Sequence, residues 1–354
     1  MHEKESRLKN FSKHRLFFPL FCLALMLLVS LIIIPDFFMV SVNNGVLYGR
    51  MIDVLNRSSE LIILAVGMTL VVSSSAGTDI SVGAVMAVSA AVCCSILAGG
   101  EVSVNEYKNP LILGVLASLG VGVLCGIWNG FLVAKMRIQP MVATLILFTA
   151  GRGIAQLITN GQITYVRVED YTILGKNIPG FPIPTSILLT ILVVVGTFLI
   201  LNKTALGMYI QSVGINSKAS KLVGLKPVLI ITITYAFAGL CSGIAGLVAS
   251  SRIYSADANN IGLNLELDAI LAVALGGNSL GGGKFSLAGS VIGAITIQTL
   301  TTALYALNVA PDQLPVFKAV IVIIIVTLQS PLVKKFMLAR KQKATNISSE
   351  TEAI

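Results

Sequence analysis

The sequence predicts an all-α, polytopic integral membrane protein. Three observations lead to that fold class: 55% of the 354 residues are hydrophobic, only 12% are charged, and the mean hydropathy is +0.88. Soluble domains carry roughly 25% charged residues, so this chain has too few charges to cover a water-exposed surface of its size. The composition therefore excludes a soluble enzyme, a disordered chain and a secreted disulfide scaffold.

Ten stretches are expected to form transmembrane helices, because about 20 apolar residues cross the bilayer core. The first follows basic residues, but Pro35 and Asp36 come after it instead of a small-residue cleavage site, so we expect a retained helix rather than a signal peptide. Only short glycine-rich breaks separate the second stretch from the third and the eighth from the ninth. The ten stretches are 16–35, 60–79, 79–101, 108–135, 139–158, 176–203, 226–252, 268–284, 284–312 and 313–334.

The basic residues predict the orientation of these helices. If the N-terminus is cytoplasmic and the chain crosses ten times, most of the 25 lysines and arginines face the cytoplasm, as the positive-inside rule requires. We therefore expect a cytoplasmic N-terminal tail (1–15), a transmembrane domain (16–333) with a cytoplasmic segment at 203–226, and a cytoplasmic C-terminal tail (334–354). Two basic residues fall within spans, Arg152 and Lys318. They are expected to snorkel toward an interface, with pairing to carboxylates as the alternative.

The residue types needed for catalysis or metal binding are scarce in the apolar stretches. Both histidines lie in the N-terminal tail, and all five cysteines lie in apolar runs without C-x-x-C spacing. Residues 277–281 match G-x-S-x-G, but no histidine is available as the base. Residues 281–284 resemble the end of a P-loop, but Asn278 and Phe285 stand where glycine and Ser or Thr are required. We expect no catalytic residue, no metal and no cofactor on this chain, and the spread of the +9 net charge between apolar runs argues against nucleic acid.

Two polar, glycine-rich breaks interrupt the apolar stretches, at 73–83 and 275–284. Similar tetrads precede them (63–66 and 270–273) and helices rich in small residues follow, which indicates a weak internal repeat. Such breaks are typical of a transport path, although two cytoplasmic hairpin turns would look the same. Asp79 is expected to cap the following helix, with direct substrate contact as the alternative. The residues concerned are Gly77, Asp79, Ser81, Gly83, Gly276, Gly277, Ser279, Gly281 and Gly282.

Glycine spacing and the cytoplasmic segment give two further predictions. Five glycines in one span, Gly114, Gly120, Gly122, Gly126 and Gly130, predict close helix packing. In 203–226, a short amphipathic helix is expected between a cap at Asn216 or Ser217 and stop signals at Gly224 and Pro227. Its apolar side would consist of Ala219, Leu222 and Val223, with Lys218 and Lys221 on the polar side. This helix is interpreted either as a docking surface for a soluble partner or as a solvated connector.

Four segments resemble those of a known family between residues 53 and 329. Residues 76–83 are similar to the motif Gly-Gly-Ile-Asp-Leu-Ser-Val-Gly, with departures at Ala76 and Thr78, and residues 139–145 are similar to the start of a fifth span. Residues 203–224 resemble a coupling loop, and 266–282 an eighth span with its glycine-rich turn. The family is that of the permeases of bacterial carbohydrate ABC importers, in the ribose/xylose/galactose branch. Segments 52–57, 151–159 and 256–260 resemble the galactofuranose-importing members.

The resemblance implies a permease subunit of the bacterial cytoplasmic membrane, surrounded by lipid. Two permease copies, identical or paralogous, would form the path for a monosaccharide: galactofuranose, a galactose-like sugar or another pentose or hexose. A separate cytoplasmic ATPase would hold ATP and Mg, and a periplasmic sugar-binding protein would deliver the substrate. The coupling residues would be Gly214, Asn216, Lys218, Ala219, Lys221, Leu222 and Gly224. Candidate path residues are Thr69, Asn129, Thr144, Gln298 and Thr302.

An ion-coupled secondary transporter of a small polar solute is the alternative function. Such a protein would also be polytopic and would lack ATP motifs. It is expected to carry more ionisable groups within its spans for proton or cation coupling, and Asp79 at a helix break is weak support for it. The sequence therefore favours the ABC permease.

Overall fold

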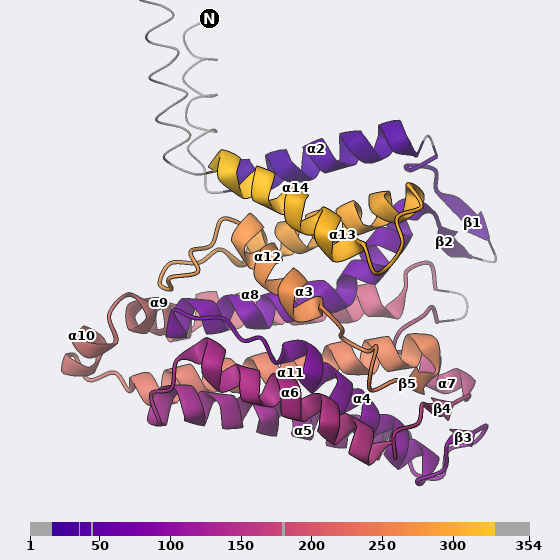
Figure 1. Ribbon diagram of the computed structural model, residues 1–354, viewed down its shortest axis with the longest axis horizontal. Helices are drawn as coiled ribbons and strands as arrows, with labels where there is room; N and C mark the ends of the chain where they lie inside the picture. The colour runs from indigo at the N-terminus through magenta and orange to yellow at the C-terminus, as the bar shows by residue number, and fades with distance from the viewer. Residues whose placement is uncertain (1–15, 35, 44, 179–180, 330–354) are drawn as a thin grey trace, which may run out of the picture.

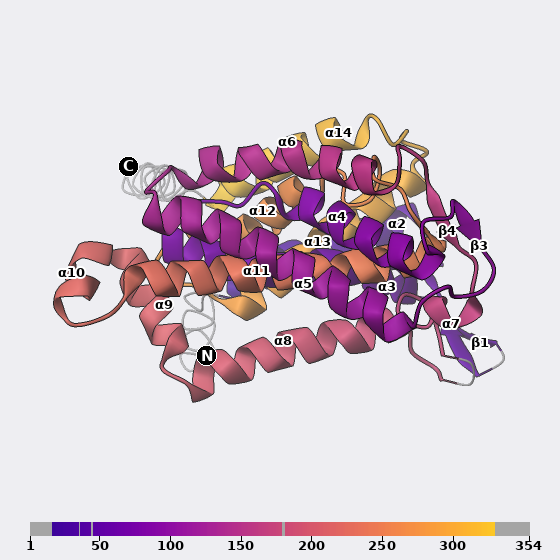
Figure 2. The ribbon, with the colours of Figure 1, turned by 90° about the horizontal axis from the view of Figure 1, so that it is seen from below.

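The helices of the molecule lie side by side along one long axis (Figures 1 and 2). The computed structural model describes residues 16–34, 36–43, 45–178 and 181–329. One end of the bundle carries the short helix α10 (Ser217–Leu222) and is called the α10 end. The opposite end carries the short β-strands and is called the strand end (Figure 2). The tails predicted at 1–15 and 334–354, and with them the location of both termini, lie outside the described residues.

The described elements are mostly helical. The strands form an antiparallel hairpin, β1 (Ser41–Asn43) with β2 (Val46–Tyr48), and a small sheet in the order β3 (Ser103–Val104), β4 (Thr164–Val166) and β5 (Ser255–Ala256). A π-helical turn, η1 (Phe131–Lys135), continues α5. The other helices are α2 (Phe17–Ile33), α3 (Arg50–Ser75), α4 (Val82–Ala98), α5 (Leu111–Gly130), α6 (Pro140–Ile158), α7 (Glu169–Thr172), α8 (Thr185–Lys203), α9 (Leu206–Ile215), α11 (Pro227–Ile253), α12 (Leu265–Leu275), α13 (Leu287–Ala306) and α14 (Leu314–Gln329).

Each of the ten predicted stretches contains a helix, but not all of these helices are long enough to cross a membrane. Within the described residues six are both long and apolar enough: α3, α5 with η1, α6, α8, α11 and α13. The apolar helices α2, α4 and α14 are shorter. With 11 residues, α12 rises only roughly 16 Å, so the stretch 268–284 is not a continuous transmembrane helix, contrary to the prediction. The second predicted helix begins earlier than expected, at Arg50.

Two short helices begin inside the bundle after a non-helical approach. Residues 76–81 connect the α10 end of α3 to α4, and residues 254–264 connect the strand end of α11 to α12. The first turns of α4 and α12 meet where Gly83 faces the Gly262 carbonyl and the Glu266 carboxylate. A Cβ at Gly83 would lie 3.3 Å from Glu266 Cδ and closer still to both oxygens. Only glycine permits this head-to-head contact.

The arrangement forms an inverted repeat rather than the repeat that the sequence suggested. The long helices α3 and α11 are antiparallel: Ser74 and Thr234 share a hydrogen bond of 2.7 Å at one end, and Arg252 donates to the Asn56 carbonyl (2.8 Å) at the other. The packing shows the same symmetry. Helix α5 packs on α11, and correspondingly α13 packs on α3. In the same way α4 packs on α5, and α12 packs on α13. The units α3–α4–α5 and α11–α12–α13 therefore correspond, whereas the tetrad comparison had paired α3–α4 with α12–α13.

The predicted glycine packing is present where α5 crosses α11. Three of the five α5 glycines, Gly122, Gly126 and Gly130, lie directly against the α11 backbone at Gly239, Tyr235 and Thr232. Gly114 packs against Leu97 of α4, but Gly120 faces open space. Lipid offers no hydrophobic drive for helix association, so close backbone approach supplies the dispersion energy instead.

We expect Gly126→Ala to destabilise the folded protein by roughly 1–3 kcal/mol, the usual cost of overpacking a tight contact. The new methyl group would lie 2.9 Å from Ala236 Cα of α11. Gly120→Ala in the same helix is the matched control, because a Cβ there meets nothing within 4 Å. Thermal unfolding of the detergent-purified variants measures the difference. Equal melting temperatures for the two variants would show that this crossing does not limit stability.

Candidate functional site

The short helix α10 projects from the end of the bundle (Figure 2). The Asn216 side chain caps it by accepting a hydrogen bond from the Ala219 N–H at 3.0 Å, and Gly224 follows it with φ of +87°. Leu222 is 89% exposed and Val223 78%, whereas Ser220 is buried. The apolar side of the predicted helix therefore points away from the bundle. The exposed apolar side fits a docking surface, because a solvated connector has no need to expose Leu222 and Val223 to water.

The α10 segment is tied to the ends of two transmembrane elements. Its neighbour α9 buries Ile210 and Val213 in a cluster with Leu70 of α3. Gly214 lies against the carbonyl oxygen of Ser73 and the backbone N of Gly283, and the Gly283 N–H donates to that same carbonyl at 2.9 Å. A displacement of α10 would therefore reach both the end of α3 and the turn between α12 and α13. Lys218, Ala219 and Lys221, the remaining predicted coupling residues, are exposed on α10.

The predicted break around Asp79 is a buried polar network. Asp79 is only 3% exposed, and its Oδ1 accepts from the Ser81 N–H at 2.8 Å and from the Ser81 hydroxyl at 2.6 Å. The Asn129 amide donates to Ser81 Oγ at 2.8 Å and, more weakly, to Asp79 Oδ2 at 3.5 Å. This geometry satisfies donors at the start of α4 inside the bundle. It fits the capping interpretation, with the carboxylate covered by its own chain.

The other predicted turn residues pack against neighbouring backbone or adopt turn conformations. A Cβ at Gly77 would collide with the ring of Pro140 at 2.5 Å, and Gly276 packs against Gly289 of α13. Gly277 and Gly282 adopt φ of +78° and +84°, which favours glycine. Ser279 Oγ accepts from the Gly281 N–H at 3.2 Å. Asn278 of the same turn was not among the predicted site residues.

Asn278 organises the turn between α12 and α13. It is buried; its Oδ1 accepts from the Ser286 N–H at 2.6 Å, and its Nδ2 donates to Ser290 Oγ at 2.8 Å. An amide between glycines is the one sequence signal that could have revealed it, since asparagine bonds backbone groups in turns.

The five candidate path residues separate into two groups. Thr69 donates to Ser290 Oγ at 2.6 Å, and Thr144 Oγ1 accepts from the Ile80 N–H at 3.2 Å. Together with Asn129, these side chains are buried and bond neighbouring segments instead of lining a cavity. Gln298 and Thr302 differ, because both line cavities toward the strand end.

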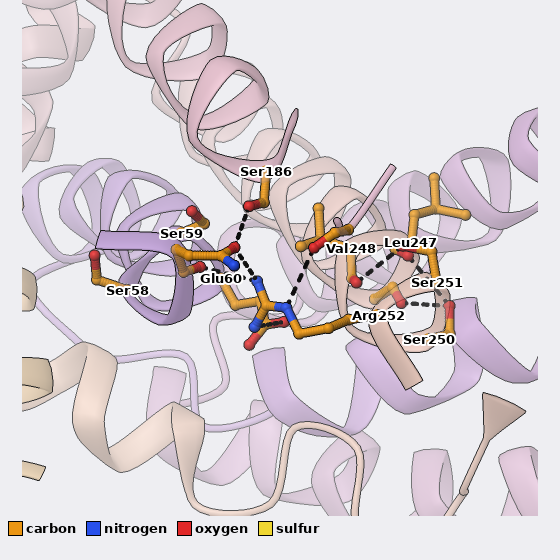
Figure 3. Close-up of polar contacts among 12 residues, drawn as sticks. Ser58, Ser59, Glu60, Ser186, Leu247, Val248, Ser250, Ser251 and Arg252 are labelled. Carbon is orange, nitrogen blue, oxygen red and sulfur yellow. Dashed lines mark hydrogen bonds and ion pairs between the residues drawn. The ribbon is translucent and has the colours of Figure 1, made fainter. Parts of the chain in front are cut away.

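A cavity of about 680 Å³ lies among α3, α11, α12, α13 and α14. Five charged residues in its wall were not predicted as site residues: Arg57, Glu60, Arg252, Asp268 and Lys318. Figure 3 shows Glu60 of α3 reaching the Arg252 guanidinium of α11, with an ion pair of 3.0 Å. Lys318 of α14 pairs with Asp268 of α12 at 2.6 Å. Two ion pairs in the wall thus join helices: one joins α3 to α11, and the other joins α12 to α14.

Lys318 forms the carboxylate pair that was the alternative to snorkelling, and Arg152 is bonded to backbone carbonyls. Lys318 is held inside by Asp268. Arg152 Nη1 donates to the carbonyl oxygens of Ala258 at 2.9 Å and Ile261 at 2.6 Å. The approach to α12 is not helical, so its carbonyl groups lack intrahelical partners, and a guanidinium can satisfy them.

Comparison with known proteins gives the family. Residues 50–328 match the model of the permease component of branched-chain amino acid transport systems. This chain belongs to that permease family. It is 45% identical over 311 residues to the galactofuranose transporter permease protein YtfT of Escherichia coli, covering 88% of each chain. It is 39% identical to the fructose import permease protein FruF of Bifidobacterium longum, covering 90% of this chain and 88% of the relative.

A third relative of this permease family is the ribose import permease protein RbsC of Escherichia coli. It is 34% identical over 309 residues, which is 86% of this chain and 91% of the relative. The resemblance to the carbohydrate ABC importer permeases, and to a galactofuranose permease among them, is thereby confirmed. A family member with six long apolar helices is a multi-pass membrane protein. The roles assigned to individual residues remain predictions.

We expect Asp79→Ala to lower the free energy of unfolding by about 1–3 kcal/mol, the cost of leaving buried donors unsatisfied. Ser81 would lose the acceptor of both its N–H and its hydroxyl. Asp53→Ala, which removes an exposed carboxylate from the first turn of α3, is the control. Thermal unfolding and the yield of inserted protein measure the effect. An unchanged melting temperature together with an altered choice of transported solute would instead assign Asp79 to substrate contact.

Proposed function

We propose that this chain is the permease subunit of a bacterial ABC importer for a monosaccharide, located in the cytoplasmic membrane. The permease relatives named for galactofuranose, fructose and ribose support the substrate class. The observation that carries the mechanism is the exposed apolar surface of α10, joined to α3 through Gly214 and Ser73. A soluble motor that grips α10 can move the transmembrane helices without any chemistry on this chain.

The partners follow from this assignment. A cytoplasmic ATPase, which holds the ATP and Mg, docks on α10, so this chain binds no cofactor of its own. A periplasmic sugar-binding protein approaches the strand end. A second permease copy, identical or paralogous, completes the path. Lipid and that copy share the exposed apolar side chains of α5, α6 and α8, among them Leu116, Leu157 and Leu192.

The transport mechanism is alternating access. Motion of the ATPase pair displaces α10, and the contact between Gly214, Ser73 and Gly283 passes the displacement to α3 and to the α12–α13 turn. Because α3 runs from the α10 end to the cavity near Glu60, a tilt of this helix changes both ends of the path together. A path with few strong contacts suits this task, since tight binding would slow release.

The three sugars in the names of the relatives share a chemical property. Galactofuranose, fructose and ribose can all adopt a five-membered ring. We therefore place furanose forms first among the substrates to test, with pyranose-only analogues as competitors. Selectivity also depends on the binding protein, so the complete importer is the unit to be measured.

The test of this function is uptake by vesicles that contain the chain with its ATPase and binding protein. We expect ATP-dependent accumulation of a neutral monosaccharide, and no accumulation by the chain alone under a proton or sodium gradient. Uphill transport by the chain alone would establish the ion-coupled alternative. Three carboxylates within the bundle do not favour that alternative, because Glu60 and Asp268 are paired with cations and Asp79 is bonded to Ser81.

We expect Leu222→Glu to abolish ATPase capture and sugar uptake while the protein still inserts, because it places a charge on the apolar docking surface. Val102→Glu is the matched control, since it charges an exposed apolar position near β3 at the opposite end. Pull-down of the ATPase and uptake by vesicles are measured for both variants. Unchanged capture and uptake with Leu222→Glu would remove the docking assignment and leave the family membership intact.

A further inference from the structure

The cavity at the strand end has the size and position of a ligand site. The proposed function assigns no ligand to it. Its volume of about 680 Å³ lies within the range of small-molecule sites, roughly 300–1,000 Å³. Given the proposed function, this end faces the side from which the solute arrives. Helices α3, α12, α13 and α14 each contribute wall residues, so relative motion of these helices would change its shape.

Four of the five charges in the wall form two ion pairs. Glu60 is paired with Arg252 at 3.0 Å, and Asp268 with Lys318 at 2.6 Å, and all four side chains are largely shielded from solvent. A charged ligand would have to compete with one member of each pair for its partner, and breaking a shielded pair is costly. A hydroxyl group, by contrast, can donate to a carboxylate or accept from a guanidinium while the pair stays intact. The pairs therefore favour a neutral, hydroxyl-rich ligand.

One cation in the wall has no ion-pair partner among the described residues. Arg57 is exposed, and it also lines the adjoining cavity together with Arg50 and Asp53. Its exposure keeps it hydrated, so its attraction for an anion is screened by water and salt. An anionic sugar is nevertheless the strongest competitor to a neutral one and must be part of any test.

Uncommitted polar groups complete the wall. The Gln298 amide on α13 is half-buried, and in the described part of the chain it makes no hydrogen bond to another residue; the same holds for the Asn264 amide. An amide offers both donors and acceptors, as a sugar hydroxyl does. Tyr305 adds an aromatic ring to the wall, and Leu267 and Leu271 add apolar area. Mixed apolar and amide surfaces suit a sugar ring, which has C–H faces and a hydroxyl edge.

We propose that this cavity, here named the Gln298 cavity, binds a neutral monosaccharide within each copy of the permease. The site holds the solute between Gln298 of α13 and the paired charges of α3, α11, α12 and α14. Its contacts are few, so the sugar is retained briefly and passed on. The proposal rests on the proposed function and adds to it a location, a set of residues and a charge preference.

Protection of a thiol tests the proposal in the complete importer. Gln298→Cys places a reactive group in the cavity, and Asn177→Cys, which lines a separate cavity at the same end of the bundle, is the matched control. Labelling by a membrane-impermeant maleimide is timed in vesicles with galactose, ribose, fructose, glucuronate, glucosamine or leucine. Wild-type protein gives the background, which is low because four of its five cysteines are buried.

We expect a neutral sugar that the importer transports to slow labelling of Gln298→Cys several-fold and to leave labelling of Asn177→Cys unchanged. Stronger protection by glucuronate, glucosamine or leucine than by that sugar overturns the neutral-sugar assignment. Equal labelling with and without the transported sugar overturns the site itself. If the Gln298→Cys protein fails to insert, Asn260→Cys on the facing segment gives the same readout.

Uptake by the wild-type importer is measured in parallel. It distinguishes failure of the Gln298 cavity from failure of the permease function. Sugar uptake without protection removes the Gln298 cavity but keeps the permease function. Absence of ATP-dependent uptake for every sugar removes the permease function and this inference with it.

Discussion

The structure depends on one constraint: non-helical backbone inside a membrane must find hydrogen-bond partners within the protein. Two segments, 76–81 and 254–264, enter the bundle with few backbone hydrogen bonds of helical type. In the first, Asp79 and Thr144 accept from the N–H groups of Ser81 and Ile80. In the second, Arg152 donates to the carbonyls of Ala258 and Ile261. Two charged residues within the bundle, Asp79 and Arg152, therefore serve as hydrogen-bond partners of these non-helical segments.

That constraint also explains the position of the glycines. Because the segments enter the bundle, the first turns of α4 and α12 meet, and only glycine at position 83 leaves room for the Glu266 carboxylate. The same absence of a side chain lets α5 and α11 approach at Gly126 and lets the α9 backbone contact Ser73 at Gly214. Close backbone contacts supply the packing that the lipid environment does not provide.

Helix α3 connects the two functional ends. Its 26 residues rise about 39 Å at 1.5 Å per residue. Along this length it carries Glu60 in the wall of the Gln298 cavity and Ser73 beside α9. It is surrounded by α8, α11, α12 and α13, so it cannot move without them. A long, buried helix with a docking contact at one end and a charged cavity near the other is suited to carry a displacement across the membrane. In the proposed function the chemistry of ATP belongs to a partner, and α3 transmits the displacement.

The sequence by itself determined the membrane class, the helical stretches, the short capped helix at α10 and the family. These features depend on apolar length, on turn residues and on local motifs, all of which are properties of neighbouring residues. It did not reveal the inverted repeat, the early start of α3 or the shortness of α12. Nor did it reveal the pairing of Lys318 with Asp268, which are 50 positions apart, or the cavity that these residues line. Only the tertiary structure decided these, because the energy of an ion pair and the volume of a cavity depend on distances between segments that no local pattern encodes.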